Sequence, residues 1–300
     1  MSPRARAPVA VTGTLLRRMR LPQPDENADK DARGRVLVVG GSKQVAGAVL
    51  LAGVAALRAG AGKLQLATVS SATAALTVAV PEALVVALPA SRSGEIAGAR
   101  AHALLASFAD SANAVLVGPG MASDRAAHAL LATLVRRVSD ECVLVLDAAA
   151  VIALAGDASM LAPLNGRAVL TPHAGEMASL LGVDKRDVER NPADVARAAA
   201  RRFGAVVALK GAETYVADPD GGVYRYAGGT VGLATSGSGD TLAGVVAGLA
   251  ARGAPPLHAA VWGAYLHGGA GRVLARRLGR VGFLARELLD EIPPLLRRLS

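Results

Sequence analysis

Cysteine and aromatic residues are scarce in this chain of 300 residues. Cys142 is the only cysteine and lies inside the apolar segment CVLVLD, which excludes a disulfide framework and predicts a buried, unreactive thiol in a reducing compartment. Aromatic residues make up 3% of the chain, whereas hydrophobic residues reach 52%. The core is therefore expected to consist of Ala, Val and Leu, with helices that pack through small residues.

Long hydrophobic runs are also missing. Residues 1–22 are basic but contain no continuous apolar segment of the kind a secretion signal needs, and no later stretch reaches membrane-spanning length without polar breaks. These absences predict a cytoplasmic protein with no membrane partner.

Acidic residues are outnumbered by basic ones. The formal charge is +9 and the isoelectric point is about 10.4, a balance that suits anionic partners. The basic residues are mostly arginines spread among Asp and Glu, and few aromatic side chains are present to stack on bases. Small anionic substrates are therefore favoured over nucleic acid. Arginines at helical spacing, Arg272, Arg276, Arg277 and Arg280, are interpreted as a solvated helix face.

The order of apolar and helical segments predicts an α/β fold. Short apolar runs occupy 35–40, 63–68, 114–118, 143–147, 168–172 and 206–211, and helical segments include 47–60, 97–108, 124–138, 192–203, 239–252 and 257–278. Continuous apolar strands that alternate with helices are typical of a mostly parallel sheet covered on both faces, a three-layer αβα sandwich. Residues 214–228 carry the turn sequence DPDGG between two alternating runs, which predicts a β-hairpin at the sheet edge.

The chain divides by composition near residue 34. Residues 1–34 are rich in Pro, Arg and Asp and predict a partly mobile lead-in. Residues 35–300 contain no linker, repeat or composition break, so they predict a single domain.

Glycines and polar residues follow the predicted strands, at the edge where open parallel sheets bind ligands. These tips are 40–43, 118–121, Asp147, 171–176 and 210–214. A sharp turn explains each glycine equally well on its own. The segment GGSKQVAG has neither the GxGxxG nor the P-loop pattern, and its small residues Ala46, Gly47 and Ala48 indicate a close approach of backbone to a ligand or to the sheet.

Residues 235–253, TSGSGDTLAGVVAGLAARG, put Asp240 in the first turn of an apolar helix. The small residues Gly237, Ser238 and Gly239 allow several backbone N–H groups to converge on one point, which suits a phosphate. Asp240 would then lie beside a bound anion. The structural alternative is a carboxylate that caps free N–H groups and interacts with the helix dipole.

Two other tips carry titratable side chains. TPHAGE stops a strand at Pro172 and sets His173 and Glu176 in the next turn, where a structural histidine and an N-terminal helix charge are the alternatives. LKGAET puts Lys210 at a strand end, where an unpaired buried charge is costly. Lys210 either bonds to turn carbonyls or begins a loop, 211–214, that wraps a ribose or phosphate.

The chain carries, in order, the segments GGSKQVAGAVLLAGVAALRAGAGKLQLAT, VGPGM, VLDAAAV, LTPHAGEMASLLG, LKGAETYVADPDG, TSGSGDTLAGVVAGLAARG and GAYLHGGAG. Together they resemble the ADP-dependent NAD(P)H-hydrate dehydratases of the ribokinase-like superfamily, from about residue 35 to the C-terminus. GSGD alone indicates the superfamily, whereas GPG, TPHxGE and KGAxT before it are specific to this branch. The resemblance implies a ribokinase-like fold and dehydration of (6S)-NADHX and NADPHX, the 6-hydroxy forms of NADH and NADPH, with ADP converted to AMP and phosphate.

The resemblance also implies site residues. It implies nucleotide contacts at Lys210, Gly211, Ala212, Glu213, Thr214, Gly237, Ser238 and Gly239, and substrate contacts at Ala48, Gly120, His173 and Asp240. Asp240 would be the catalytic base that takes the hydroxyl proton as the hydroxyl is phosphorylated. ADP or ATP is the implied co-substrate, accompanied by Mg²⁺, for which no ligands are assigned. A homo-oligomer, a tetramer, is expected.

Two departures from the family pattern leave alternatives open. Family members have LDADAL where this chain has LDAAAV, so Ala149 replaces an acid and Val151 a leucine, and Arg286 and Glu287 replace a polar-acid pair. Ala149 motivates a nucleotide-binding module without turnover. A kinase for a hydroxymethylpyrimidine or thiazole alcohol would use the same glycine turn and acid, although the motif order disfavours it.

Many relatives carry an additional epimerase domain, for which residues 1–34 leave no room.

Overall fold

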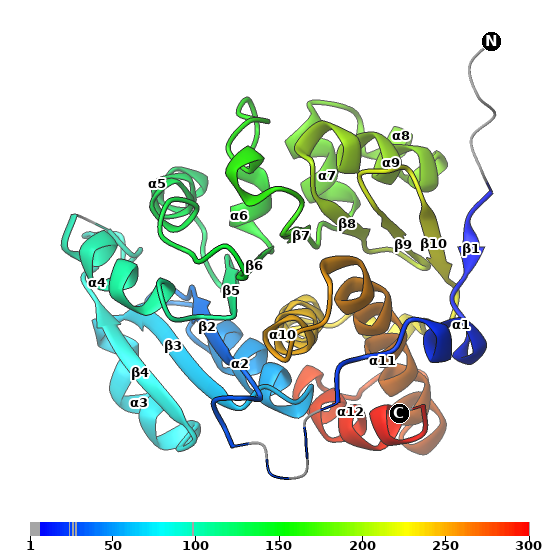
Figure 1. Cartoon of the computed structure of the whole chain (residues 1–300), viewed down its shortest axis with the longest axis horizontal. Helices are drawn as coiled ribbons and strands as arrows, with labels where there is room; N and C mark the ends of the chain where they lie inside the picture. Colours follow the sequence, from blue (N-terminus) through cyan, green and yellow to red (C-terminus); the bar gives the residue numbers. More distant parts are fainter. Residues whose placement is uncertain (1–6, 24, 26, 28, 98, 300) are drawn as a thin grey trace.

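The computed structural model describes residues 7–23, 25, 27, 29–97 and 99–299, and their strands form one sheet (Figure 1). Within these residues the sheet has ten strands in the order β1-β10-β9-β8-β7-β6-β5-β2-β3-β4. The strands are β1 (Val9–Ala10), β2 (Arg35–Val39), β3 (Lys63–Val69), β4 (Ala83–Leu88), β5 (Ala114–Val117), β6 (Val143–Leu146), β7 (Ala168–Leu170), β8 (Val206–Leu209), β9 (Thr214–Ala217) and β10 (Val223–Tyr226). Only β9 runs antiparallel to its described neighbours, β8 and β10, which confirms the mostly parallel sheet.

Helices cover both faces of the sheet (Figure 1). One face carries α2 (Gly47–Arg58), α10 (Ser238–Ala251), α11 (Pro256–Arg277) and α12 (Leu288–Arg297). The other carries α4 (Ala99–Ala109), α5 (Asp124–Leu134), α6 (Ala149–Ile152), α7 (Ala174–Leu181), α8 (Lys185–Arg190) and α9 (Pro192–Phe203). The short helix α3 (Thr73–Ala79) lies against β4, and α1 (Gly13–Arg18) precedes the sheet's central strands in the chain. The predicted αβα sandwich is confirmed.

Each central strand divides its side chains between two cores. In β2, Val36 and Val38 enter the core beneath α2 and α10. Leu37 and Val39 enter the second core, formed with α4 to α9. Continuous apolar runs such as RVLVV result from this burial on both faces. Cys142 lies in the second core, where burial raises the pKa of its thiol to about 12, as expected for an unreactive cysteine.

The predicted hairpin forms from β9 and β10. Its turn is fixed by Asp218, whose Oδ1 accepts a hydrogen bond from the Gly222 N–H at 2.9 Å. The expected position at the sheet edge is wrong, because β1 pairs in parallel with β10 and forms the outermost strand on that side.

The strand β1 comes from the segment predicted as a lead-in. The helix α1 follows it, with Leu16 fully buried, and the indole Nε1 of Trp262 donates a hydrogen bond of 2.6 Å to the Met19 carbonyl. A boundary between lead-in and domain at residue 34 stays a prediction. None of the helices in the described ranges combines the length and apolar character that crossing a bilayer requires.

Glycines bring the helices α2 and α10 into backbone contact. A Cβ on Gly244 would lie 2.1 Å from the Ala52 carbonyl oxygen, and one on Gly248 would lie 2.3 Å from that of Ala56. Because no real Cβ approaches an oxygen so closely, only glycine allows this helix separation. The expected packing through small residues is thus realised between the two helices that begin beside the sheet's carboxyl ends.

We expect Gly248→Ala to lower the free energy of unfolding by roughly 1–3 kcal/mol, because the added methyl forces α10 away from α2. Gly47→Ala is the matched control, since a Cβ at this helical position meets no heavy atom within 4 Å, and it should change stability by less than about 0.5 kcal/mol. Urea unfolding of both variants measures the difference. Equal stability of the two would contradict the packing argument.

Candidate active site

The strands β2 and β5 are neighbours in the sheet, but the chain continues from β2 towards one edge of the sheet and from β5 towards the other. β3 and β4 lie beyond β2, whereas β6 to β10 lie beyond β5. Ligands of open parallel sheets bind at such a switch point, beyond the carboxyl ends of the strands. Here Gly120 has a φ of +70°, and a Cβ on it would lie 2.3 Å from the Val45 carbonyl oxygen and 3.0 Å from the Ala48 Cβ. Ala48 and Gly120, both expected at the substrate, are therefore neighbours at the switch point.

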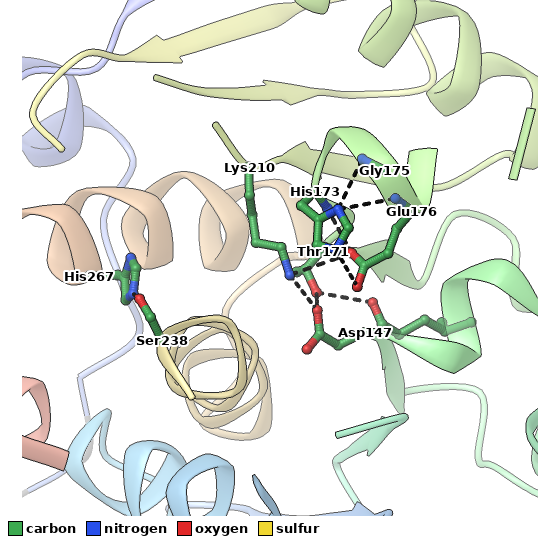
Figure 2. Close-up of polar contacts among 9 residues, drawn as sticks. Asp147, Thr171, His173, Gly175, Glu176, Lys210, Ser238 and His267 are labelled. Carbon is green, nitrogen blue, oxygen red and sulfur yellow. Dashed lines mark hydrogen bonds and ion pairs between the residues drawn. The ribbon is translucent and has the colours of Figure 1, made fainter. Parts of the chain in front are cut away.

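Lys210 is the centre of a charged cluster at the tips of β6, β7 and β8 (Figure 2). Its Nζ donates a hydrogen bond of 2.7 Å to Asp147 Oδ1 and lies 3.8 Å from Glu176 Oε2. Asp147 is buried and also accepts a bond of 2.7 Å from Thr171 Oγ1. The lysine main chain is tied to the neighbouring tip, because its N–H donates to the Pro172 carbonyl at 2.7 Å. Lys210 is thus paired with carboxylates, not with turn carbonyls.

Asp240 lies in the first turn of α10 beside this cluster. Burial, together with the negative charges of Asp147 and Glu176, raises the pKa of Asp240 to about 6, although the positive charge of Lys210 opposes the shift. Burial would lower the pKa of Lys210, but the same carboxylates outweigh it, so the pKa of the ammonium is raised and the lysine stays charged. A carboxyl group with a pKa close to neutrality can accept a proton and release it again, which is the property of a general base.

A cavity of about 690 Å³ opens next to the cluster. It is lined by His173, Lys210, Gly211, Ala212, Thr214, Tyr226, Gly229, Thr230, Val231, Leu233, Ala234, Thr235, Ser238, Gly239, Leu242, Ala264, His267 and Gly268. Its size is that of a small-molecule site, and its walls combine aliphatic side chains with the first residues of α10, Ser238 and Gly239. Thr230 Oγ1 is buried in the wall without a hydrogen-bond partner among the described residues, so a polar ligand atom would satisfy it.

Most of the expected nucleotide residues line this cavity, but Glu213 and Gly237 do not. The Glu213 carboxylate accepts hydrogen bonds from Arg225 Nε at 2.6 Å and from the Tyr215 hydroxyl at 2.8 Å. Gly237 is the N-cap of α10, with a φ of +87°. Only the Glu213 main chain is therefore left for a ligand, and Gly237 shapes the turn. Asp240 is not in the wall either, but it follows Gly239, which is.

His173 has the structural role that the sequence left open. It is the N-cap of α7, and its Nδ1 accepts hydrogen bonds from the N–H groups of Gly175 at 3.0 Å and Glu176 at 3.1 Å. Glu176 Oε2 in turn accepts from the His173 N–H at 2.7 Å, which completes a capping box. The imidazole also borders the cavity, so the cap orients its ring towards the site.

Several polar groups of the site were not assigned from sequence. Asp147 and Glu176 follow adjacent strands, and the carboxyl ends of parallel neighbours meet at one edge, which is the signal that could have paired them with Lys210. His267 lies within GAYLHGGAG, where it is the only titratable residue besides Tyr265, and its Nε2 is 2.9 Å from Ser238 Oγ. Thr230 had no distinguishing pattern.

The backbone after Asp147 is strained. Ala148 has a φ of 48° and a ψ of −125°, a combination that glycine favours in tight turns, and the Ala150 N–H closes the turn on the Asp147 carbonyl at 3.0 Å. The Asp147 carbonyl also lies so close to Gly118 that a Cβ there would be 1.8 Å away. The turn directs Asp147 towards Lys210. Ala149, in place of the expected acid, is buried in the first turn of α6.

We expect Ala148→Gly to raise the free energy of unfolding by about 1 kcal/mol, because glycine adopts this backbone conformation without steric cost. Ala150→Gly, two residues on in the helix α6, should instead lower it by at least about 0.5–1 kcal/mol. Thermal and denaturant unfolding compare the variants. A loss of stability in Ala148→Gly as large as in Ala150→Gly would show that the turn is unstrained.

The sheet order, the helix layers and the acid after a glycine turn at the start of α10 define a ribokinase-like α/β protein. A solved structure described as a ribokinase-like superfamily protein, from Enterococcus faecalis, superposes with a TM-score of 0.82 at 24% identity, over 97% of this chain and 96% of that chain. The sequence profile of a family described as NAD(P)H-hydrate dehydratase matches residues 36–294. The chain therefore belongs to the NAD(P)H-hydrate dehydratase family, as the sequence resemblance predicts.

Two relatives document this membership. The ADP-dependent (S)-NAD(P)H-hydrate dehydratase of Xanthomonas campestris is 52% identical over 96% of this chain and 96% of its own length. The crystal structure of ADP/ATP-dependent NAD(P)H-hydrate dehydratase from Bacillus subtilis, co-crystallized with ATP and Mg²⁺, has a TM-score of 0.77 and 29% identity, covering 98% of this chain and 99% of that one.

Proposed function

We propose that this chain catalyses the ADP-dependent dehydration of (6S)-NADHX and NADPHX to NADH and NADPH, with release of AMP and phosphate. The observation that carries the proposal is Asp240, a carboxyl with a pKa of about 6 at the helix start that joins the cavity to the switch point. The Xanthomonas campestris relative, 52% identical, bears this activity in its name.

ADP would occupy the cavity of about 690 Å³. Its phosphates would bind at the start of α10, where the Gly239 N–H has no hydrogen-bond partner among the described residues and the helix dipole favours an anion. A Cβ on Gly239 would lie 3.2 Å from Lys210 Nζ, so the ammonium adds its charge at the same point. The loop of Gly211, Ala212, Glu213 and Thr214 would enclose the ribose, with Glu213 contributing its main chain only. Aliphatic wall residues such as Leu233 and Leu242 suit the base.

The hydrated nicotinamide would lie at the switch point, between Ala48, Gly120 and the imidazole of His173. The contacts of α2 with α10 support this arrangement. Ala52 faces Gly244 and Ala56 faces Gly248. One helical turn earlier, four residues before the first of these pairs on each helix, Ala48 comes opposite Asp240. The carboxylate and the small-residue wall would thus face one substrate.

In the first step Asp240 would accept the proton of the C6 hydroxyl. The hydroxyl oxygen forms a bond to the β-phosphorus of ADP, the bond from that phosphorus to the bridging oxygen breaks, and AMP leaves with the electron pair. The helix N–H groups and Lys210 would hold the negative charge of the transferred phosphoryl group.

In the second step the phosphorylated hydrate would lose phosphate. The ring-nitrogen lone pair forms a double bond to C6 as the C6–O bond breaks, and transfer of a proton from C5 to the departing phosphate then restores the dihydropyridine. Phosphorylation is needed because hydroxide is a poor leaving group, whereas phosphate leaves readily. Asp147 and Glu176 would act indirectly, by holding Lys210 and by setting the pKa of Asp240.

Mg²⁺ would enter with the nucleotide. No group of three or more His, Cys, Asp and Glu side chains among the described residues could hold a metal, and Lys210 lies between Asp147 and Glu176. Mg²⁺ is commonly held by substrate phosphates, waters and one or two carboxylates, so the phosphates of ADP would supply the main ligands. The bound ion would neutralise phosphate charge.

The function is tested with purified protein, hydrated NADH and either ADP or ATP. Recovery of the absorbance of the reduced nicotinamide, with one AMP formed per NADH when ADP is used, supports the dehydratase. Phosphorylation of a hydroxymethylpyrimidine or thiazole alcohol without this recovery would support the kinase instead. Tight ADP binding without any turnover would support the binding module that Ala149 suggests.

We expect Asp240→Asn to lower kcat by at least about 100-fold, because the amide cannot accept the hydroxyl proton. Its Kd for ADP should stay within about threefold, since the helix N–H groups and Lys210 remain. The matched control is Asp187→Asn on α8, where the carboxylate is exposed, and it should leave both quantities unchanged. Wild-type turnover in Asp240→Asn would remove Asp240 from the mechanism.

We expect kcat to fall with decreasing pH below about 6, because Asp240 must be ionised to act as a base and its pKa lies there.

The raised pKa of Asp240 also makes the stability of the fold depend on pH. The folded-state pKa lies above the model value of 3.8, so protonated Asp240 favours the folded state and this contribution is lost as the pH rises through about 6. Asp240→Asn should therefore raise Tm more at pH 8 than at pH 4. A kcat midpoint near pH 4 would show an unperturbed carboxyl.

We also propose that the chain forms a cytoplasmic homo-oligomer, a tetramer. Residues 35–300 would be its catalytic domain. The small apolar residues of the helices permit association, and the family resemblance supports it. Light scattering of the purified chain measures the assembly.

A further inference from the structure

The side chains of Ser238, which is buried, and His267, which is partly buried, have no part in the steps above. Ser238 is the first residue of α10 and is 4% exposed, and His267 lies in the middle of α11. Ser238 Oγ is 2.9 Å from His267 Nε2, and both residues line the cavity of about 690 Å³. Figure 2 shows the pair on the far side of Lys210 from Asp147. A buried polar pair in the wall of a ligand cavity is costly unless every donor and acceptor is used.

His267 is neutral at physiological pH. Burial and then the positive charge of Lys210 lower the pKa of the imidazole to about 4, against a hydrogen bond with the Ser238 main chain that favours the protonated form. A neutral imidazole carries one N–H, so Nε2 either donates to the hydroxyl or accepts from it. Which of the two it does depends on the tautomer of the ring.

The direction of this hydrogen bond decides what Ser238 offers the cavity. If Nε2 accepts, the hydroxyl proton is used within the protein and only oxygen lone pairs face a ligand. If Nε2–H donates, the hydroxyl proton is free for an acceptor. The acceptor expected at this helix start is an anion, because the ammonium of Lys210 lies beside Gly239 at the positive end of the helix dipole.

We propose that His267 is a positioning residue, which donates Nε2–H to the Ser238 hydroxyl so that the hydroxyl donates its proton to a phosphate oxygen of the bound nucleotide. The proposal rests on the proposed function in one respect, that ADP occupies this cavity. It adds to that function a side-chain donor whose orientation is set from the neighbouring helix α11, so that phosphate binding depends on the contact between α10 and α11.

His267→Leu and His267→Gln form the matched test. Leucine keeps the bulk and removes the hydrogen bond, whereas the glutamine amide keeps an N–H donor. Calorimetric titration with ADP should give a Kd about tenfold weaker for His267→Leu and within about threefold of wild type for His267→Gln. Titration with adenosine, which has no phosphate, should give the wild-type Kd for both variants. Equal losses for ADP and adenosine would show a packing effect and overturn the proposal.

A double-variant cycle tests the route through Ser238. Ser238→Ala should weaken ADP binding about as much as His267→Leu, and the combined variant should bind no more weakly than Ser238→Ala alone. Losses that add would mean that His267 acts independently of the hydroxyl, which overturns the proposal. Circular dichroism and Tm of each variant identify any that fail to fold, and His267→Gln then carries the test with Ser238→Ala.

The affinity measurements separate this proposal from the proposed function. Wild-type chain that binds ADP but does not dehydrate NADHX overturns the function and leaves the comparison of Kd values valid. An unchanged ADP Kd in His267→Leu, with normal dehydration in wild type, overturns only the role of His267. Wild-type chain that does not bind ADP removes both.

Discussion

The ammonium of Lys210 between buried carboxylates is the interaction on which the site depends. Asp147, Glu176 and Asp240 converge on it from the tips of β6 and β7 and from the start of α10, and all of them contribute to raising its pKa. Without a central cation the negative charges of these acids would repel one another. A buried ion pair that loses one partner typically costs about 3–5 kcal/mol. The lysine therefore offsets the repulsion among the carboxylates, and its positive charge limits the rise in the pKa of Asp240, which reaches about 6.

Helix packing determines where that charge meets the rest of the site. The glycine contacts of α10 with Ala52 and Ala56 on α2 fix how far α10 can slide along its neighbour. The start of α10, with Asp240, is thereby held level with the start of α2, next to the loops of the switch point. The glycines of α10, which would weaken an isolated helix, therefore have a positional role. Stability and chemistry are linked through the same helix pair.

The sequence predicts the architecture where burial is two-sided and the segments are long. β2, β5, β6 and β8, and the helices α2, α9, α10 and α11, lie within a few residues of the predicted ranges. The sequence did not predict β4, although it is apolar, because it is an edge strand with Leu84 52% exposed. It did not predict β1 either, because two residues are too few to form a pattern. The short helices α3, α6 and α8 depend on tertiary packing, since isolated helices of that length are marginal.

Motifs identified the loops of the candidate site, but not the direction of each side chain. Lys210, Gly211, Ala212 and Gly239 share one cavity wall, whereas Glu213, inside the same motif, turns to Arg225. That choice depends on an arginine in the next strand of the hairpin, which no local pattern specifies. The pairing of Ser238 with His267 likewise requires the crossing of α10 and α11, a contact between segments far apart in the chain.

The alanine at position 149 can be judged in the same electrostatic terms. Relatives are expected to have an acid there, two residues after Asp147, and its absence suggests a weakened enzyme. Yet the site already sets three carboxylates, those of Asp147, Glu176 and Asp240, against the single ammonium of Lys210. A further negative charge beside Asp147 would raise the pKa of Asp240 again and reduce the ionised fraction of the base at neutral pH. Because Ala149 is apolar and buried, it adds no charge to the cluster around Lys210, and Asp240 retains the raised pKa that suits a general base.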